Sequence, residues 1–109
     1  MRVISKKALK DFAEIHPDAL SSLEDWNTRV LAADWHSSVD VLKDFPTTSD
    51  RVGTCHVFNI AWNKYRLIAV IHYPRMGKSG NTTEGRVYVR HILTHREYDK
   101  DAWKKECGC

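Results

Sequence analysis

The side chains best suited to acid–base chemistry gather near the C-terminus, in the segment RHILTHREYDK at positions 90–100. It contains two histidines, two arginines, one tyrosine and two carboxylates. An imidazole titrates at about pH 6.5, so near neutral pH it can accept or donate a proton. A guanidinium binds phosphate oxygens in a forked geometry that a lysine cannot reproduce. This combination suits proton transfer on an anionic substrate.

RNA cleavage is a reaction that such groups can catalyse without an added nucleophile. A base takes the proton of the ribose 2′-hydroxyl, whose oxygen attacks the adjacent phosphorus, and an acid protonates the departing 5′-oxygen. We therefore select His95 as the general acid or base, Tyr98 as a group that orients or protonates, and Arg66 and Arg90 as the phosphate-binding cations. The simpler alternatives are a capping or surface role for His95, a core-covering role for Tyr98, and an ion pair of Arg90 with a nearby carboxylate.

A metal-dependent reaction has weaker support in the sequence. His91 and His95 are four residues apart, a spacing that brings two zinc ligands together only on a helix, whereas residues 86–93 have the pattern of a strand. The H-E-x-x-H order is absent, as are the P-loop, G-x-G-x-x-G and G-x-S-x-G motifs. We expect neither a metal nor another cofactor.

The whole chain, residues 1–109, has the size and composition of one globular domain, with 42% hydrophobic and 28% charged residues. Its longest apolar run, Leu67–Ile71, is much shorter than the roughly 20 residues of a membrane span, so we expect no membrane partner. The opening MRVISKKALKDF lacks the apolar core of a secretory signal, and two of the three cysteines lie in the last three residues. We therefore expect no disulfide framework and a cytoplasmic location.

The net charge of +3 is distributed unevenly along the chain. Residues 1–60 contain 7 basic and 9 acidic side chains, whereas residues 61–109 contain 10 basic and 5 acidic ones. This asymmetry favours a surface in the second half of the chain that faces a polyanion, although basic faces without a nucleic-acid partner are common.

The first half of the chain is typical of helices. A short strand at 1–4 precedes a helix over 6–16, which Ser5 is placed to cap. Pro17 ends that helix and begins a second one that continues to about residue 33, and a third helix runs over 38–45. The sequence therefore predicts two antiparallel helices joined by a tight turn, followed by a shorter helix.

The second half is typical of strands. Residues 55–61, 65–73 and 86–93 are rich in β-branched and aromatic side chains, and they are separated by a short turn and by a longer, glycine-rich loop at 74–85. A turn and a short amphipathic helix are expected to end the chain. We predict an α+β domain with a mainly antiparallel sheet of three strands, or four if the N-terminal strand joins, packed against the helical hairpin.

Strand periodicity assigns the side chains of the two longer strands to faces of this sheet. On the last strand we expect one face to carry Val87, Val89 and His91 and the other to carry Tyr88, Arg90 and Ile92, while on the middle strand Arg66 shares a face with Ile68, Val70 and His72.

Two blocks of the sequence resemble a known family. The segments FNIAWNKYRLI (58–68) and VYVRHILTHREYDK (87–100) follow the patterns FN-x-x-x-N-x-[YF]-R-L-[IV] and [VY]-[YI]-[IV]-R-x-[IV]-x-[TS]-H-x-[EQ]-Y-D. These patterns are similar to those of the HigB toxin family, part of the wider RelE-like group, and the opening ISKKALKDFAEIHPDA resembles that family's first helix. The ending T-H-x-E-Y-D is the most specific part of the resemblance, which extends over nearly the whole chain.

The resemblance implies a RelE-like fold and a small bacterial type II toxin that cleaves mRNA without a metal, commonly on the translating ribosome. Its partner would be a HigA-like antitoxin with a helix-turn-helix domain, through which the toxin–antitoxin complex binds operator DNA. The positions that match the family pattern are Asn63, Arg66, Arg90, His95, Tyr98 and Asp99.

This chain departs from the family pattern in the turn before Arg66. Many members have small residues there, often glycine, where this chain has Ala61 and Trp62, so an aromatic ring is placed where it could stack on a base. The candidate RNA-binding residues are Trp62, Asn63, Lys64, Tyr65, Asp99, Lys100 and Lys104.

Two other functions remain open. A non-catalytic RNA- or ribosome-binding protein could block translation by occupancy, with phosphate contacts from Lys64, Arg66, Lys78, Arg86, Lys104 and Lys105. An interaction subunit with no RNA-related role is the third possibility.

Overall fold

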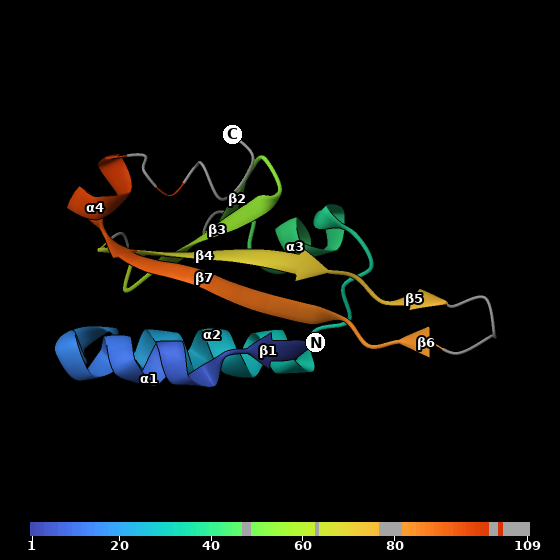
Figure 1. Cartoon of the computed structure of the whole chain (residues 1–109), viewed down its shortest axis with the longest axis horizontal. Helices are drawn as coiled ribbons and strands as arrows, with labels where there is room; N and C mark the ends of the chain where they lie inside the picture. The colour runs from blue at the N-terminus through green and yellow to red at the C-terminus, as the bar shows by residue number, and fades with distance from the viewer. Residues whose placement is uncertain (47–48, 63, 77–81, 101–102, 104–109) are drawn as a thin grey trace.

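A five-stranded sheet organises the fold of this chain (Figure 1). Its strand order is β1 (Arg2–Ile4), β7 (Arg86–Thr94), β4 (Tyr65–His72), β3 (Cys55–Ile60) and β2 (Ser49–Val52). β1 runs parallel to β7, and each other neighbouring pair is antiparallel. The computed structural model describes residues 1–46, 49–62, 64–76, 82–100 and 103. This sheet confirms the expected α+β class and the mainly antiparallel pairing.

β2 is one strand more than the sequence predicted, because residues 49–52 lie in a stretch that reads as a turn. The hairpin from β2 to β3 reverses through Gly53 and Thr54, with Val52 paired opposite Cys55. Gly53 has a φ of 57°, which glycine adopts without steric cost and which a tight hairpin of this length requires. The polar residues that precede this glycine hide the strand, because they lack an alternation of apolar side chains.

Three helices precede β2 and confirm the predicted helical segments. α1 (Lys6–Ile15) and α2 (Leu20–Ala32) are joined by one turn of 3-10 helix, η1 (Pro17–Ala19), and α3 (Ser38–Asp44) follows. The Ser5 hydroxyl caps α1 by accepting a hydrogen bond from the Lys7 N–H at 3.1 Å. α1 and α2 lie side by side along one face of the sheet (Figure 1). Within the described residues, no helix is both long and apolar enough to cross a membrane.

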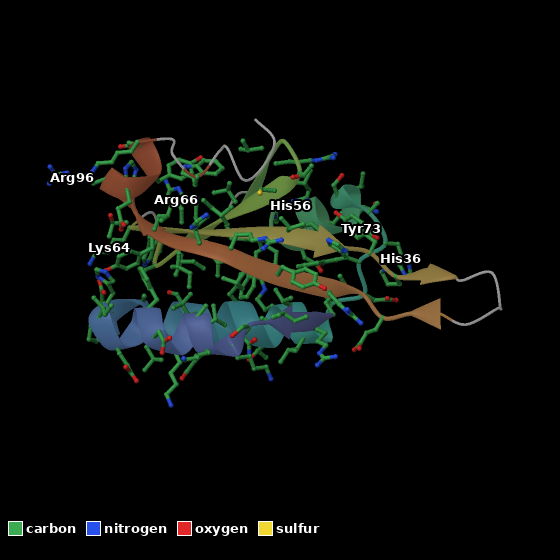
Figure 2. All side chains as sticks on the ribbon, in the orientation of Figure 1. His36, His56, Lys64, Arg66, Tyr73 and Arg96 are labelled. Carbon is green, nitrogen blue, oxygen red and sulfur yellow. The ribbon has the colours of Figure 1, made fainter. Side chains whose placement is uncertain are left out.

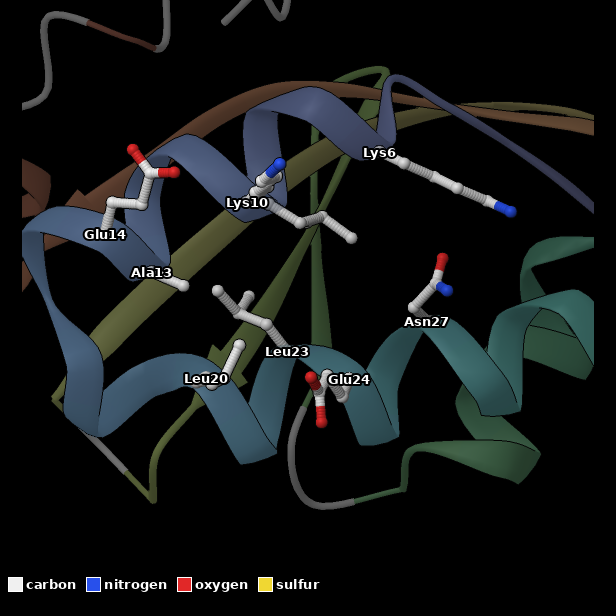
Figure 3. Close-up of a pocket in the computed structure, with 9 residues that line it drawn as sticks. Lys6, Lys10, Ala13, Glu14, Leu20, Leu23, Glu24 and Asn27 are labelled. Atoms are coloured by element: carbon white, nitrogen blue, oxygen red, sulfur yellow. The ribbon is translucent and has the colours of Figure 1, made fainter.

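The α1–α2 hairpin carries a groove of about 330 Å³ between its two helices (Figure 3). Leu9, Ala13, Leu20 and Leu23 line it together with lysine and glutamate side chains of both helices. None of its described lining residues is a histidine, tyrosine or arginine. The side chains selected for acid–base chemistry and phosphate binding therefore lie outside this groove.

The two faces of the sheet are covered by clusters of different size. The face toward α1 and α2 belongs to the large core, whose fully buried members include Leu23, Val30, Phe58, Leu67 and Val87. The opposite face has a smaller cluster, made of Cys55, Val57, Ile68 and Trp103. We call this opposite face the open face, because no helix of the α1–α2 hairpin covers it (Figure 1).

Cys55 is disulfide-bonded, in contrast to the expectation of no disulfide framework. The other two cysteines of the chain, Cys107 and Cys109, lie outside the described residues. Two cysteines can be joined when the fold brings their Cα atoms to about 6 Å, whatever their separation in the sequence. Cysteine spacing alone therefore gave no indication that Cys55 has a disulfide partner.

A β-bulge at Arg90 corrects the predicted division of side chains on β7. Ile68 of β4 pairs with His91, but the next residue, Ala69, pairs with Val89, so the ladder passes over Arg90. One extra residue reverses the alternation of every position after it. His91 therefore shares the open face with Arg66, and Ile92 packs into the helix-facing core, opposite to the prediction for both.

The sheet has two distinguishable ends. At one end β7 leads directly into α4 (His95–Asp99), which is the predicted C-terminal helix. At the other end the predicted long loop contains a two-stranded ribbon of β5 (Arg75–Met76) and β6 (Thr82–Thr83), which projects beyond the main sheet (Figure 1). We refer to these as the α4 end and the ribbon end.

Candidate active site

A capping box fixes the point at which β7 ends and α4 begins. The Thr94 hydroxyl accepts a hydrogen bond from the Glu97 N–H at 3.3 Å, while the Glu97 carboxylate accepts one from the Thr94 N–H at 3.1 Å. The hydrogen bonds from the Thr94 N–H and hydroxyl lower the pKa of the Glu97 carboxyl. Glu97 thus has a structural task, which is to hold His95 at the first position of the helix.

His95 and Asp99 form a pair across one turn of α4. The His95 Nδ1 lies 3.3 Å from the Asp99 Oδ2, and the two side chains are 51% and 64% exposed. A carboxylate can only accept a hydrogen bond, so this contact requires the proton on Nδ1 and directs the Nε2 lone pair away from Asp99. The solvent-facing nitrogen of His95 can then exchange a proton with a bound substrate.

Tyr98 lies on the open face between an arginine and a tryptophan. The guanidinium of Arg66 is 5.4 Å from the centre of the Tyr98 ring, and the ring of Trp103 stacks on it at 5.0 Å with an angle of 17° between the planes. The Trp103 Nε1 also donates a hydrogen bond to the Tyr98 carbonyl at 3.0 Å. These contacts restrict the position of the Tyr98 ring.

Trp103 is a site residue that sequence reasoning missed. It is only 3% exposed and belongs to the small cluster on the open face, although it lies in a polar C-terminal segment. A single large aromatic residue in such a segment was the available signal, because a tryptophan is rarely left exposed without a binding role.

Arg66 reaches the α4 end because of the register of β4. Tyr65 pairs with Thr94, so the residue after it lies beside the start of α4 (Figure 2). The Arg66 Nη1 donates a hydrogen bond to the Tyr65 carbonyl at 3.2 Å. The structure therefore brings together His95, Tyr98, Asp99 and Arg66, which come from two elements far apart in the sequence.

Arg90, the other predicted phosphate-binding cation, lies farther along the sheet. Its guanidinium is 5.9 Å from the centre of the Tyr88 ring, and within the described part of the chain its contact is with this ring and not with a carboxylate. At about 3.3 Å per residue, Arg90 is about 13 Å along β7 from Thr94. The structure thus does not bring Arg90 into the group around His95.

Lys64 and Tyr65 connect the start of β4 to the helices. The Lys64 Nζ lies 2.9 Å from one Asp18 carboxylate oxygen, and the Tyr65 hydroxyl donates to the other at 2.7 Å. The hydrogen bond from Lys64 lowers the pKa of Asp18, and the hydrogen bond to Asp18 raises the pKa of Tyr65. The Tyr65 ring is buried against Phe12 on the helix-facing side. The RNA-binding roles of Lys64 and Tyr65 remain predictions.

Trp62 stands out in the turn between β3 and β4. Its side chain is 96% exposed, and both Ala61 and Trp62 have positive φ values, 52° and 64°, a backbone region that favours glycine. The Lys64 N–H closes this turn by donating to the Ala61 carbonyl at 3.2 Å. A bulky exposed residue in a strained conformation indicates a role other than stability.

The structure describes some of the remaining RNA-binding candidates and not others. Asp99 and Lys100 are exposed at the C-terminal end of α4. Asn63 and Lys104 lie outside the described residues, as do Lys78 and Lys105. Arg86 is half-buried and donates to the Tyr88 hydroxyl at 3.4 Å. Within the described part of the chain, no group of three or more histidine, cysteine or carboxylate side chains is arranged to hold a metal ion.

The chain is similar to characterised toxins over most of its length. A family model described as HigB_toxin, the RelE-like toxic component of a toxin-antitoxin system, matches residues 19–101. The mRNA interferase toxin HigB of Escherichia coli (strain K12) is 26% identical over 101 residues, which are 91% of this chain and 88% of that protein. The mRNA interferase HigB proteins of Escherichia coli O157:H7 and Shigella flexneri match with the same identity and coverage. Since the matched residues make up most of the chain and include strands β2 to β7 and the α4 site, the chain belongs to the HigB family of RelE-like toxins.

Proposed function

We propose that this HigB-family chain is an mRNA interferase, an endoribonuclease that cleaves mRNA during translation at the ribosome. The observation that carries the proposal is the His95–Asp99 pair on α4, with Arg66 and Tyr98 beside it. The names of the relatives, which are mRNA interferases, support the substrate class. A proton-exchanging imidazole next to a guanidinium matches the needs of cleavage by the 2′-hydroxyl.

Each residue of the site has a separate task in this proposal. Arg66 binds the scissile phosphate and stabilises the charge that develops on it. His95, held in one tautomer by Asp99, transfers a proton through Nε2, either from the 2′-hydroxyl or to the departing 5′-oxygen. Tyr98 orients the phosphate or takes part in the second proton transfer. Trp103 is a positioning residue, because it is buried and acts through its contact with Tyr98.

RNA binding extends beyond the reacting groups in this proposal. Trp62 stacks on a base, since its ring is exposed in the turn just before Lys64, which lies at the α4 end of the sheet (Figure 2). Phosphate and base contacts come from Asn63, Lys64, Tyr65, Asp99, Lys100 and Lys104, and Arg90 binds phosphate farther along the strand. The reaction needs no metal, because these groups supply the acid, the base and the cations.

The partners follow from the family in the same way. A toxin of this kind has an antitoxin, and we propose a HigA-like antitoxin whose helix-turn-helix domain carries the complex to operator DNA. The site of action is the cytoplasm, where translated mRNA and ribosomes are found.

The test compares three variants during induced expression in growing cells. His95→Gln and Asp99→Asn change the proposed catalytic pair, and Asp11→Asn changes an exposed carboxylate on α1 as a control. Mapping of transcript ends should find new ends in coding regions with the unmodified chain and with Asp11→Asn, and none with His95→Gln. Growth arrest with transcripts that remain full-length would contradict cleavage and support the non-catalytic translation inhibitor instead.

A further inference from the structure

A second cleft, of about 600 Å³, lies near the ribbon end of the sheet, away from α4. It is enclosed by the residues that precede and begin α3, by the β2–β3 hairpin and by the C-terminal end of β4. Figure 2 shows His56, Tyr73 and His36 in this part of the molecule. The volume is in the range of about 300–1,000 Å³ that is usual for small-molecule sites.

The lining of this cleft is rich in donors and lacks acids. Its polar members include Ser37, Arg51, Thr54, His56, His72 and Tyr73. None of the described lining residues has a carboxylate. Such a lining disfavours a cation and suits an anion with several oxygen acceptors, of which a phosphate is the common biological example.

His56 provides independent evidence for a ligand. It is only 3% exposed, its Nε2 lies 3.3 Å from the Tyr73 hydroxyl, and its Nδ1 has no hydrogen-bond partner among the described residues. Burial, together with the charge of Arg51, lowers the pKa of His56 to about 4, so the ring is neutral. A neutral imidazole has one donor and one acceptor nitrogen, and a buried polar atom without a partner is rare.

Arg51 supplies the positive charge of the cleft. It pairs with His56 across the β2–β3 ladder, and its Nε donates to the Gly53 carbonyl at 3.4 Å. Its charge also acts on Tyr73: burial and the nearby charge of Asp40 raise the pKa of Tyr73, and Arg51 lowers it in part. The guanidinium therefore acts on both polar groups that mark the interior of the cleft.

The polar groups that mark the interior of the cleft lie on the helix-facing side of the sheet, because Arg51 pairs with His56 and His56 pairs with Ala69 of the large core. His72 also lines the cleft but lies on the open face, beyond the last pair between β3 and β4.

A polar and aromatic strip extends from His72 to the α4 end along the open face. Arg66 and His72 share this face of β4 and are six residues apart, or about 20 Å at 3.3 Å per residue. Tyr88 lies between them on β7, with His72 packed edge-on against its ring at 5.0 Å and the Arg90 guanidinium over it. Cations that alternate with aromatic rings are the pattern that binds single-stranded nucleic acid.

We propose that the ribbon-end cleft binds one nucleotide unit, with its phosphate at Arg51 and its base or ribose at His56 and Tyr73. The unit belongs to the RNA strand whose cleaved phosphate is at Arg66, several nucleotides away, and this part rests on the proposed function. From the cleft, the strand passes around the end of β4 at His72, where β4 has no pairing with β3, and reaches the open face. The strip of Tyr88 and Arg90 then carries the strand to Arg66, which gives Arg90 a role outside the group around His95.

The first measurement uses the purified full-length His95→Gln chain and uridine 5′-monophosphate. NMR titration should shift the imidazole signals of His56 and the backbone signals of residues 51–56, with binding in the millimolar range. Arg51→Gln in the same background should weaken this binding about tenfold, because a charge-assisted contact to phosphate is lost. The matched control is Arg2→Gln, an exposed arginine of the opposite edge strand, which should bind as before. Absence of shifts in this cleft at 10 mM nucleotide, a concentration about tenfold above the expected Kd, would overturn the proposal.

The second measurement separates the RNA strand from a mononucleotide in solution. A twelve-nucleotide RNA should bind the His95→Gln chain more tightly than the mononucleotide, and Arg51→Gln should reduce its affinity about tenfold and lower the salt dependence by about one phosphate contact. If the mononucleotide shifts the cleft signals but the RNA affinity does not change in Arg51→Gln, the site binds a nucleotide in solution and the RNA path is wrong. Circular dichroism of each variant checks that it is folded. Both measurements avoid cleavage, so their outcome is distinct from that of the transcript mapping.

Discussion

The Nδ1 of His95 and the Oδ2 of Asp99 face each other at 3.3 Å across one turn of α4, and no element other than this helix is needed to form the pair. Its geometry therefore depends on how α4 starts. Thr94 and Glu97 determine that start through their reciprocal hydrogen bonds. A capping box thus fixes the orientation of the imidazole relative to β4 and Arg66.

Asp99→Asn should slow RNA cleavage about ten- to a hundredfold without loss of stability. The amide preserves the size of the side chain but removes the negative charge that holds the His95 proton on Nδ1. Cleavage of a translated message by purified protein and ribosomes measures the rate, and thermal unfolding measures stability. A rate equal to that of Asp11→Asn would show that Asp99 does not orient His95.

Arg66 and Arg90 should differ in the kind of defect that their loss causes. Arg66→Gln should lower the rate at saturating RNA about a hundredfold, because Arg66 lies beside Tyr98 and stabilises charge at the phosphate. Arg90→Gln should mainly raise the RNA concentration needed for half-maximal rate, because Arg90 lies over Tyr88. Equal losses of the maximal rate in both variants would contradict this separation.

Trp62→Gly should make the chain more stable and weaken its RNA binding. Glycine adopts the φ of 64° at this position without strain, so the free energy of unfolding should rise by about 0.5–1 kcal/mol. Loss of the exposed ring removes a stacking contact worth about 1–3 kcal/mol per base. Urea unfolding and RNA titration measure the two effects.

Trp62→Ala is the control for this prediction. It removes the ring but keeps a Cβ atom at the strained position, so it should weaken RNA binding without the gain in stability. If both variants bind RNA as the unmodified chain does, Trp62 does not stack on a base.

Trp103→Ala should lower the free energy of unfolding by about 3–5 kcal/mol, since Trp103 is buried against Cys55, Val57 and Ile68. Trp103→Phe keeps an aromatic ring next to Tyr98 but loses the Nε1–H donor to the Tyr98 carbonyl, and should cost less. Urea unfolding compares the two. A cost under 1 kcal/mol for Trp103→Ala would mean that this side chain does not cover the open face in solution.

The free energy of unfolding should decrease as the pH falls from about 6.5 to 4, because of His56. Its pKa is lowered to about 4 in the folded state by burial, so the unfolded chain binds a proton in this range and the folded chain does not. The expected loss is at most about 3 kcal/mol, and it levels off below pH 4. Urea unfolding at several pH values measures it.

His56→Gln should reduce this pH dependence, because glutamine does not titrate. His36→Gln, at an exposed histidine that pairs with Asp34 at 3.1 Å, should leave it in place. A pH dependence that is the same in all three proteins would place its origin in another group.

Local rules made the helices predictable, whereas the bulge in the sheet could not be predicted from them. Ser5 and Pro17 mark helix boundaries through capping and a fixed φ, which act within a few residues. The bulge at Arg90 depends on the register between β7 and β4, and no feature of the segment RVYVRHIL marks the residue that the ladder skips. The predicted face of His91 was wrong for this reason.

The residue types of the candidate site were predictable because chemistry limits them, whereas only part of their arrangement was. His95, Tyr98 and Asp99 lie within one short helix, so their proximity follows from their spacing. Arg66 joins them through strand pairing, and Arg90 does not, although both matched the same family pattern. The place of Trp103 in the site results from contacts across the open face, which the spacing of residues in the sequence does not reveal.

The pairing of β1 with β7 joins two segments that are 84 positions apart in the sequence. Arg2 pairs with Arg86, and β7 lies in the sheet between β1 and β4. At about 5–20 residues per second, synthesis of the intervening chain takes several seconds. During this time the strand that leads into α4 does not yet exist, so β1 has no partner in the nascent chain and the His95–Asp99 pair forms only after β7 and α4 have been made.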